Sequence, residues 1–245
     1  MKIAVKKQFS NTSERRAVIS ADSQIGGASQ GRCRSTEAKN PTGVACSCEA
    51  LKESDMQYFR RLLTAIDTQP YLDEIAAVEG AWDQSTGRQN KIRVQREAQA
   101  IPLRGLRKSA IAGRKRSDVH ESRWTSGSVN FPLACQFLRD TAKAEDSLLS
   151  RGKIVCLPAG RRVYPHIDRG EYYAVRNRYH LVLKSACGSW LKAGDEEIRM
   201  QEGELWWFDN KQVHEAYNDG DQDRIHMIFD LLPRAAAERV FGTAA

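Results

Sequence analysis

Two side chains that could bind a metal lie close together in the stretch RRVYPHIDRG, at residues 161–170. His166 and Asp168 are two positions apart, and in an extended segment such residues point to the same side. His214 follows 46 residues after Asp168. Two imidazoles and one carboxylate on one side of a divalent cation leave three positions open, as in the facial triad of non-haem Fe(II) oxygenases. The predicted chemistry is therefore oxygen activation at a metal.

An arginine follows these three residues. Arg224 lies ten residues after His214, at the start of an apolar segment. Near a metal, its guanidinium could bind a carboxylate through two parallel hydrogen bonds. An iron enzyme that uses a keto-diacid as cosubstrate needs such a group. Arg224 could instead pair with Asp221 or Asp223 at the surface.

Further polar side chains lie on predicted strands. Arg178 and His180 share one face of RYHLVL and offer a second polar pair. His180 belongs either to the site or to an ordinary barrel interior. His226 shares a strand face with Arg224, and we expect it to be packed and hydrogen-bonded rather than a metal ligand.

Short strands are needed to bring these residues together. After residue 150, apolar segments alternate with turn signals, in the order KIVCLP, RYHLVLKS, SWLKAG, EEIRMQEGELWWFD, HEAYN and RIHMIFDLLP. Many short strands at this spacing predict an all-β barrel or jelly roll. Such a fold could return His214 to the neighbourhood of His166. A short helical end is expected after Pro233.

The preceding region predicts helices. Apolar residues recur at helical spacing in EALKESDMQYFRRLLTAID (49–67), YLDEIAAVEGAW (71–82) and FPLACQFLRDTAKAEDSLLS (131–150). NKIRVQREAQAIPLRGL indicates a strand and then a loop, and residues 107–125 indicate a basic loop. Residues 1–50 are polar and rich in Ser, Gly, Lys and Arg, which predicts a disordered basic tail. We expect one domain over 51–245, with a helical support region at 51–150 and the β core at 151–233.

Composition narrows the class of protein. The formal charge is +7, and residues 88–123 hold eleven Lys and Arg against three acidic residues, a net charge of +8. This segment could attract an acidic partner or nucleic acid, or form a solvated rim that attracts anionic substrates. No apolar run reaches the ~18–20 residues of a membrane span, and no secretory signal is visible. We therefore expect a cytoplasmic protein with its six cysteines reduced.

Four blocks, YPHID, RYHLVL, GELWWFDNKQVHEAYN and DRIHMIFD, resemble in their order and spacing the aspartyl/asparaginyl β-hydroxylase family of 2-oxoglutarate-dependent oxygenases. The resemblance covers residues 153–233, and AIPLRGL at 100–106 extends it upstream. It implies a mainly β fold with N-terminal helices around a double-stranded β-helix core, which is a jelly roll of cupin-like type. It also implies Fe(II), 2-oxoglutarate and O2 as metal and cosubstrates.

The resemblance assigns roles to single residues. It makes His166 and His214 iron ligands, and it gives Arg224 the distal carboxylate of 2-oxoglutarate. The peptidyl aspartyl hydroxylases of the family lack a carboxylate at the position of Asp168, whereas members that act on free amino acids or other small substrates keep one. The expected site residues are the metal ligands and catalytic residues His166, Asp168 and His214, and the cosubstrate-binding residues Arg224, Arg178 and His180, the last two matching the family's Arg-x-His pair.

The predicted function is that of a dioxygenase that hydroxylates an amino-acid side chain. The substrate would be either a peptidyl Asp or Asn-type residue or a free amino acid or small metabolite. The alternative is a non-catalytic, cupin-like metal-binding module whose basic loop binds nucleic acid or an acidic partner. Formation of succinate from 2-oxoglutarate would separate the two hypotheses.

Overall fold

The computed structural model describes residues 56–84, 93–107 and 113–242, which belong to a compact unit spanning Cys48–Ala245. Its elements in chain order are β1 (Phe59–Leu63), α1 (Gln69–Ala76), η2 (Arg93–Gln95), β2 (Gln99–Leu106), η3 (Arg116–Asp118), β3 (Ser122–Trp124), η4 (Ser126–Asn130), α3 (Pro132–Ala144), β4 (Ser147–Leu157), β5 (Arg161–His166), α4 (Glu171–Ala174), β6 (Asn177–Lys184), β7 (Ser189–Ala193), β8 (Glu196–Ile198), β9 (Leu205–Phe208), β10 (His214–Asn218), β11 (Arg224–Pro233) and α5 (Arg234–Phe241). The tail predicted to be disordered, residues 1–50, lies outside the described residues.

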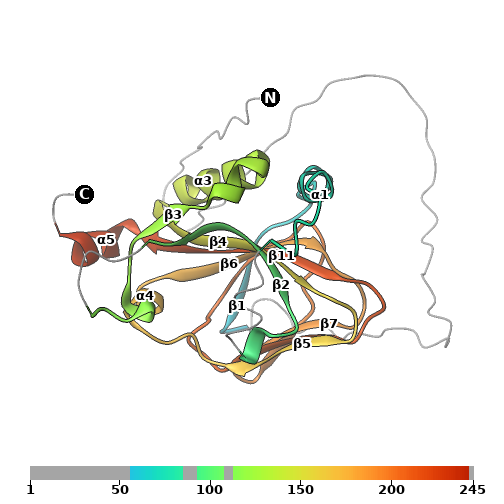
Figure 1. Ribbon diagram of the computed structural model, residues 1–245. Coiled ribbons are helices and arrows are strands. Elements are labelled where there is room, and N and C mark those ends of the chain that lie inside the picture. The colour runs from blue at the N-terminus through green and yellow to red at the C-terminus, as the bar shows by residue number, and fades with distance from the viewer. Residues whose placement is uncertain (1–55, 85–92, 108–112, 243–245) are drawn as a thin grey trace, which may run out of the picture. The chain divides into compact units, whose positions relative to one another are not determined.

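Two antiparallel sheets form the framework. The larger sheet has the strand order β1-β9-β6-β11-β4-β2-β3, and the smaller has the order β5-β10-β7-β8. Helices α1 and α3 cover one face of the larger sheet, while β5 and β7 lie on its other side (Figure 1). The prediction of a mainly β, double-stranded β-helix fold with a few helices is confirmed. None of the helices in the described part of the chain has the length and apolarity that crossing a membrane requires.

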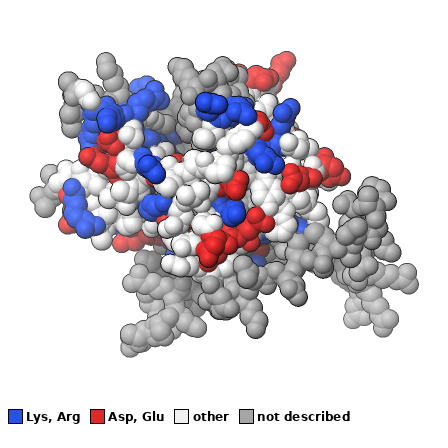
Figure 2. Space-filling model, turned by 90° about the horizontal axis from the view of Figure 1, so that it is seen from below, with Lys and Arg blue, Asp and Glu red and all other residues white. Residues whose placement is uncertain are grey.

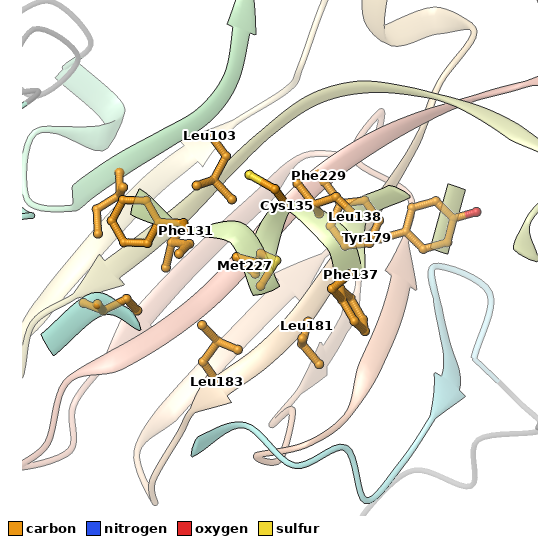
Figure 3. Packing of buried hydrophobic residues seen from close by; sticks show 14 of the residues in the cluster. Leu103, Phe131, Cys135, Phe137, Leu138, Tyr179, Leu181, Leu183, Met227 and Phe229 are labelled. Atoms are coloured by element: carbon orange, nitrogen blue, oxygen red, sulfur yellow. The ribbon is translucent and has the colours of Figure 1, made fainter. Parts of the chain in front are cut away.

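The outer core lies between the larger sheet and the helices. It is built from the odd-numbered residues of β6 and β11 together with one face of α3, and Figure 3 shows these side chains meeting. Tyr179 and Phe229 stack on neighbouring strands with ring centroids 5.4 Å apart, and Phe137 of α3 meets Phe229 edge-on. This packing explains why α3 forms where its apolar stripe was predicted.

The inner core lies between the two sheets. Val155, Val182 and Phe208 of the larger sheet pack in the same cluster as Leu191 and Ala216 of the smaller one. Because side chains alternate along a strand, the even-numbered residues of β6 and β11 face this inner space. The polar candidates of these two strands are even-numbered, and they therefore lie inside the molecule.

The helix predicted over residues 49–67 is wrong in its described part. Phe59–Leu63 forms β1, which pairs antiparallel with β9 and closes that edge of the larger sheet. Arg61 forms an ion pair with Glu204 at 2.7 Å, and Phe59 stacks on Phe208. In so short a segment the apolar spacing fits helix and strand equally well, and the open edge of β9 decides the outcome.

Two other predicted boundaries also differ. The helix predicted over residues 131–150 ends at Ala144, and Ser147–Leu157 forms the long strand β4, which lies between β2 and β11 in the sheet. Asp146, with a φ of 45°, turns the chain between the two elements. Part of the segment predicted as a basic loop is ordered as η3 and β3. The helices predicted near residues 71–80 and after Pro233 form as α1 and α5.

Candidate metal centre and active site

Two histidines face each other on neighbouring strands of the smaller sheet. β5 and β10 run antiparallel, and His166 and His214 are direct partners in their register. Their ring centroids are 4.2 Å apart. The carboxylate of Asp168, just beyond the end of β5, approaches His214 with 4.0 Å between Oδ2 and Nε2. One possible ligand atom from each of the three residues lies within 4.8 Å of the others.

Backbone carbonyls fix which nitrogen of each imidazole is free. His166 Nδ1 lies 2.7 Å from the carbonyl oxygen of Tyr164, and His214 Nδ1 lies 3.0 Å from that of Gln212. A carbonyl oxygen only accepts, so each Nδ1 carries the proton and donates it. The Nε2 lone pair of each ring therefore remains available to a metal, an arrangement typical of metal-binding histidines.

The carboxylate of Asp168 is held from two sides. Its Oδ2 accepts hydrogen bonds from Arg178 Nη1 and, at 3.0 Å, from Asn210 Nδ2. Burial acts to raise the pKa of Asp168, but the cation of Arg178, the positive field of His214 and the hydrogen bond from Asn210 outweigh it and lower the pKa to about 2. Asp168 is thus an anion at neutral pH.

Arg178 connects this carboxylate to the larger sheet. Its Nε donates to Asp230 Oδ1 at 2.8 Å and its Nη2 donates to Asp230 Oδ2 at 3.2 Å. Asp230 also accepts from the hydroxyl of Tyr172 at 3.1 Å. The guanidinium of Arg178 therefore bridges two carboxylates. Sequence reasoning gave Arg178 only a place in the cosubstrate pocket, and it missed Asp230 and Asn210.

Arg224 is a buried cation with no ion pair to an acidic side chain of the described residues. The residue is 5% exposed, and its Nη2 has no hydrogen-bond partner among the described residues. Burial lowers its pKa to about 10. The surface pairs with Asp221 or Asp223 that the sequence allowed do not form. A buried, unpaired guanidinium is costly, so the site favours an anion beside it.

The predicted residues of both sheets meet around one cavity. A cavity of about 60 Å3 lies between the sheets, and His166, His214, Arg178, His180 and Arg224 all line it. Asp168 lies beside it and lines the neighbouring cleft. The six predicted residues are therefore neighbours in space, although their distances in the chain reach more than fifty residues.

His180, which lines this cavity, forms a neutral pair with His226. Their Nδ1 atoms lie 3.3 Å apart, and both residues are buried. Burial lowers the pKa of both imidazoles well below the ordinary value, and the nearby charge of Arg224 lowers it further. His226 does not line the cavity, in keeping with its expected role as a packed residue.

The chain matches the model of a known protein family. The model of the aspartyl/asparaginyl beta-hydroxylase family matches residues 112–233. This range contains all four sequence blocks quoted above and ends with β11, whereas AIPLRGL at 100–106 falls outside it. A search of curated proteins gave no significant match.

Solved structures with some likeness include a prolyl hydroxylase from Trichoplax adhaerens in complex with a hypoxia inducible factor peptide. It is 13% identical, with a TM-score of 0.47, and the match covers 79% of this chain and 90% of that one. A prolyl-4-hydroxylase from Pseudomonas putida is 12% identical, with a TM-score of 0.45 and coverages of 73% and 94%. A 2OG-Fe(II) oxygenase family oxidoreductase from Burkholderia pseudomallei is 9% identical, with a TM-score of 0.41 and coverages of 67% and 89%.

Proposed function

The chain belongs to the aspartyl/asparaginyl β-hydroxylase family and is a 2-oxoglutarate-dependent hydroxylase, and on this premise we propose that it uses Fe(II) and O2 to hydroxylate an amino-acid side chain, in a free amino acid or in a peptide. The observation that carries the proposal is the buried guanidinium of Arg224, which lines the same cavity as His166 and His214 and whose Nη2 has no hydrogen-bond partner among the described residues. A metal site next to an anion site is what a keto-diacid cosubstrate requires.

The donor set fits Fe(II). His166 and His214 would each contribute Nε2, because Nδ1 of both rings donates to a backbone carbonyl. Asp168 would contribute an oxygen that is ionised at neutral pH because its pKa is about 2. Two neutral imidazoles and one carboxylate suit a non-haem Fe(II) centre and leave positions for other ligands. These three residues would hold the metal.

The anion site fits a diacid. Arg224 would bind the distal carboxylate of 2-oxoglutarate, which would supply the negative charge that this buried guanidinium lacks. His180, on the neighbouring strand β6, lines the same cavity and is neutral, so it adds a polar contact without a competing negative charge. When bound, Fe(II) with 2-oxoglutarate and O2 supplies the oxidising chemistry of hydroxylation, which converts the cosubstrate to succinate and CO2.

The protein itself would orient the metal-binding side chains and exclude water from the cavity. Arg178 and Asn210 fix the orientation of the Asp168 carboxylate, and the two carbonyls fix the imidazoles. Phe208 lies against both His214 and His180, with ring centroids 5.4 Å and 4.9 Å away, and walls the inner side of the cavity. A dry, shaped cavity of this kind protects a reactive centre.

The non-catalytic alternative lacks a supporting feature in the described residues. On the face shown in Figure 2, Lys and Arg side chains are interspersed with Asp and Glu. In the described part of residues 88–123, Arg114 pairs with Glu171 at 3.2 Å, and Arg104 and Arg116 line the cleft beside the metal site. Arg114 therefore turns toward an acidic neighbour, and Arg104 and Arg116 turn toward the cleft.

The test is succinate formation from 2-oxoglutarate by the purified protein with Fe(II) and O2. We expect turnover in the wild type, including the slow turnover without substrate, and none in His214→Ala. Asp73→Asn, on the exposed surface of α1, serves as the matched control and should behave as the wild type. Fe(II)-dependent succinate formation that persists in His214→Ala would contradict the proposal.

A further inference from the structure

Asp168 differs from the other two proposed metal ligands because it does not lie on a strand. β5 ends at His166 and β10 begins at His214, whereas Asp168 lies in the loop between β5 and α4. The register of β5 and β10 makes the two histidines direct partners and so fixes both. The backbone N–H of Asp168 donates to the carbonyl of Asn210 at 3.3 Å. The rest of its support must come from the loop and from α4.

Tyr172 anchors the short helix α4 that follows this loop, and it is fully buried. Its hydroxyl donates to Oδ2 of Asp230 at 3.1 Å and accepts from the backbone N–H of Arg151 at 2.9 Å. Burial and the charge of Asp230 raise the pKa of Tyr172 well above its ordinary value, so the hydroxyl keeps its proton. Asp230 binds Arg178, which donates to Asp168. Hydrogen bonds therefore connect the backbone of β4 to the proposed metal ligand.

Arg176 lies just after α4 and is a buried cation that the proposed reaction does not use. The residue is 2% exposed. Its Nε donates to Ser150 Oγ at 2.8 Å, and its Nη1 donates to the carbonyl of Tyr172 at 2.8 Å and to Nδ1 of His120 at 2.9 Å. The guanidinium also lies over the ring of Tyr172, 4.0 Å from its centroid. Burying a cation costs free energy, and here its hydrogen bonds join β4, α4 and the segment before β3.

η3 packs against the start of α4. Gly170 has a φ of 114°, and a Cβ at this position would lie 2.6 Å from the carbonyl oxygen of Ser117. The backbone N–H of Glu171 donates to Oδ1 of Asp118 at 3.1 Å. The loop that carries Asp168 is therefore held on the side of η3 as well as on the side of β4.

We propose that Tyr172 and Arg176 are positioning residues for Asp168. The inference rests on the proposed function, in which Asp168 is a metal ligand. Arg176 fixes α4 on β4, and Tyr172 passes this support to the carboxylate of Asp168 through Asp230 and Arg178. The two side chains set the orientation of the carboxylate before a metal binds. Their loss should therefore weaken metal binding, beyond any loss of stability.

Tyr172→Phe tests the inference because it removes the hydroxyl and keeps the ring. The probe is Mn(II) alone, titrated without O2 and followed by the electron paramagnetic resonance signal of free Mn(II). We expect the affinity to fall about five- to ten-fold. The melting temperature of the metal-free protein is measured on the same samples.

Arg176→Lys is a second variant. It keeps the charge but loses the planar fork that reaches both Ser150 and the carbonyl of Tyr172, so it should weaken Mn(II) binding at least as much. Where Arg176→Lys does not fold, Tyr172→Phe decides the matter.

Tyr179→Phe is the matched control. The hydroxyl of Tyr179 also donates to a carboxylate, Oε2 of Glu145, at 3.1 Å, and the residue is 2% exposed in the outer core. No hydrogen bond connects this pair to Asp168 in the described part of the chain. We expect a lower melting temperature and an unchanged Mn(II) affinity, which separates positioning from a general loss of stability.

A double variant tests the route of the effect. If Tyr172 acts through Asp230, then Tyr172→Phe combined with Asp230→Asn should bind Mn(II) with an affinity within about two-fold of that of Asp230→Asn alone. Independent contributions would instead multiply the two losses.

Each outcome decides. A Mn(II) affinity of Tyr172→Phe within about two-fold of the wild type, or an equal loss in Tyr179→Phe, would overturn the inference and leave the proposed function intact. Losses that multiply in the double variant would also overturn it, because Tyr172 would then act by another route. A wild type that binds no Mn(II) would instead contradict the proposed function.

Discussion

Arg178 and Asp230 are direct partners across β6 and β11, and two hydrogen bonds of 2.8 Å and 3.2 Å join the guanidinium to the carboxylate. The remaining Nη1 of Arg178 donates to Asp168. Arg178 of the larger sheet therefore holds Asp168, the carboxylate that would complete a metal site built mainly on the smaller sheet. Tyr172 fixes Asp230 in turn through its hydroxyl.

Removing the charge of Asp230 should weaken metal binding without touching a ligand. In Asp230→Asn, Arg178 loses its anchor, so Asp168 is held less firmly, and we expect the Fe(II) affinity to fall about 10- to 100-fold. Anaerobic titration with Fe(II) or Mn(II) measures this. Asp73→Asn on α1 is the control. An unchanged affinity in Asp230→Asn would show that Arg178 holds Asp168 without its anchor on Asp230.

Arg224→Gln should act on the cosubstrate. The variant keeps a hydrogen-bonding group but loses the charge, and a hydrogen bond to a charged group contributes about 1.5–3 kcal/mol, so we expect the KM for 2-oxoglutarate to rise about 10- to 100-fold. Metal affinity measured without 2-oxoglutarate should change much less. If the KM for 2-oxoglutarate stays the same, Arg224 does not bind this cosubstrate.

Acid should destabilise the fold through its buried histidines. Burial keeps the pKa values of His180 and His226 well below those of an unfolded chain, about 6.5, so the unfolded state binds more protons as the pH falls below that value. The free energy of unfolding should be nearly constant above about pH 7 and should decrease below about pH 6.5, by up to about 1.4 kcal/mol per pH unit for each histidine.

The variant His226→Gln separates this effect from other acid-sensitive groups. Its free energy of unfolding, measured by urea titration between about pH 5 and pH 7, should depend less steeply on pH than that of the wild type. The slope that remains comes from the other groups with shifted pKa values, such as His180 and Asp168. Equal slopes in the two proteins would show that His226 is protonated as readily in the folded chain as in the unfolded one.

Much of the candidate site could be predicted because strands alternate with a period of two. His166 with Asp168, and Arg178 with His180, are pairs in which both members necessarily face the same way on an extended chain. The four sequence blocks then predicted the fold that brings these pairs together. Their roles as ligands of iron and 2-oxoglutarate remain predictions.

Other features depend on which strands become neighbours, and the sequence alone does not state this. Asp230 lies at the end of an apolar run, and only the pairing of β6 with β11 places it opposite Arg178. Phe59–Leu63 forms a strand because β9 offers it an open edge, although its apolar spacing fits a helix equally well. The cleft beside the metal site, which Arg104 of β2 and Arg151 of β4 both line, likewise requires that these two strands be neighbours.

The most direct test of the account is anaerobic Fe(II) binding to the wild type, His166→Ala and His214→Ala, with and without 2-oxoglutarate. We expect one Fe(II) per wild-type chain, bound more tightly when 2-oxoglutarate is present, and loss of this binding in both variants. Fe(II) that binds equally well after either histidine is removed, or a wild type that binds none, would contradict a metal centre at His166, Asp168 and His214.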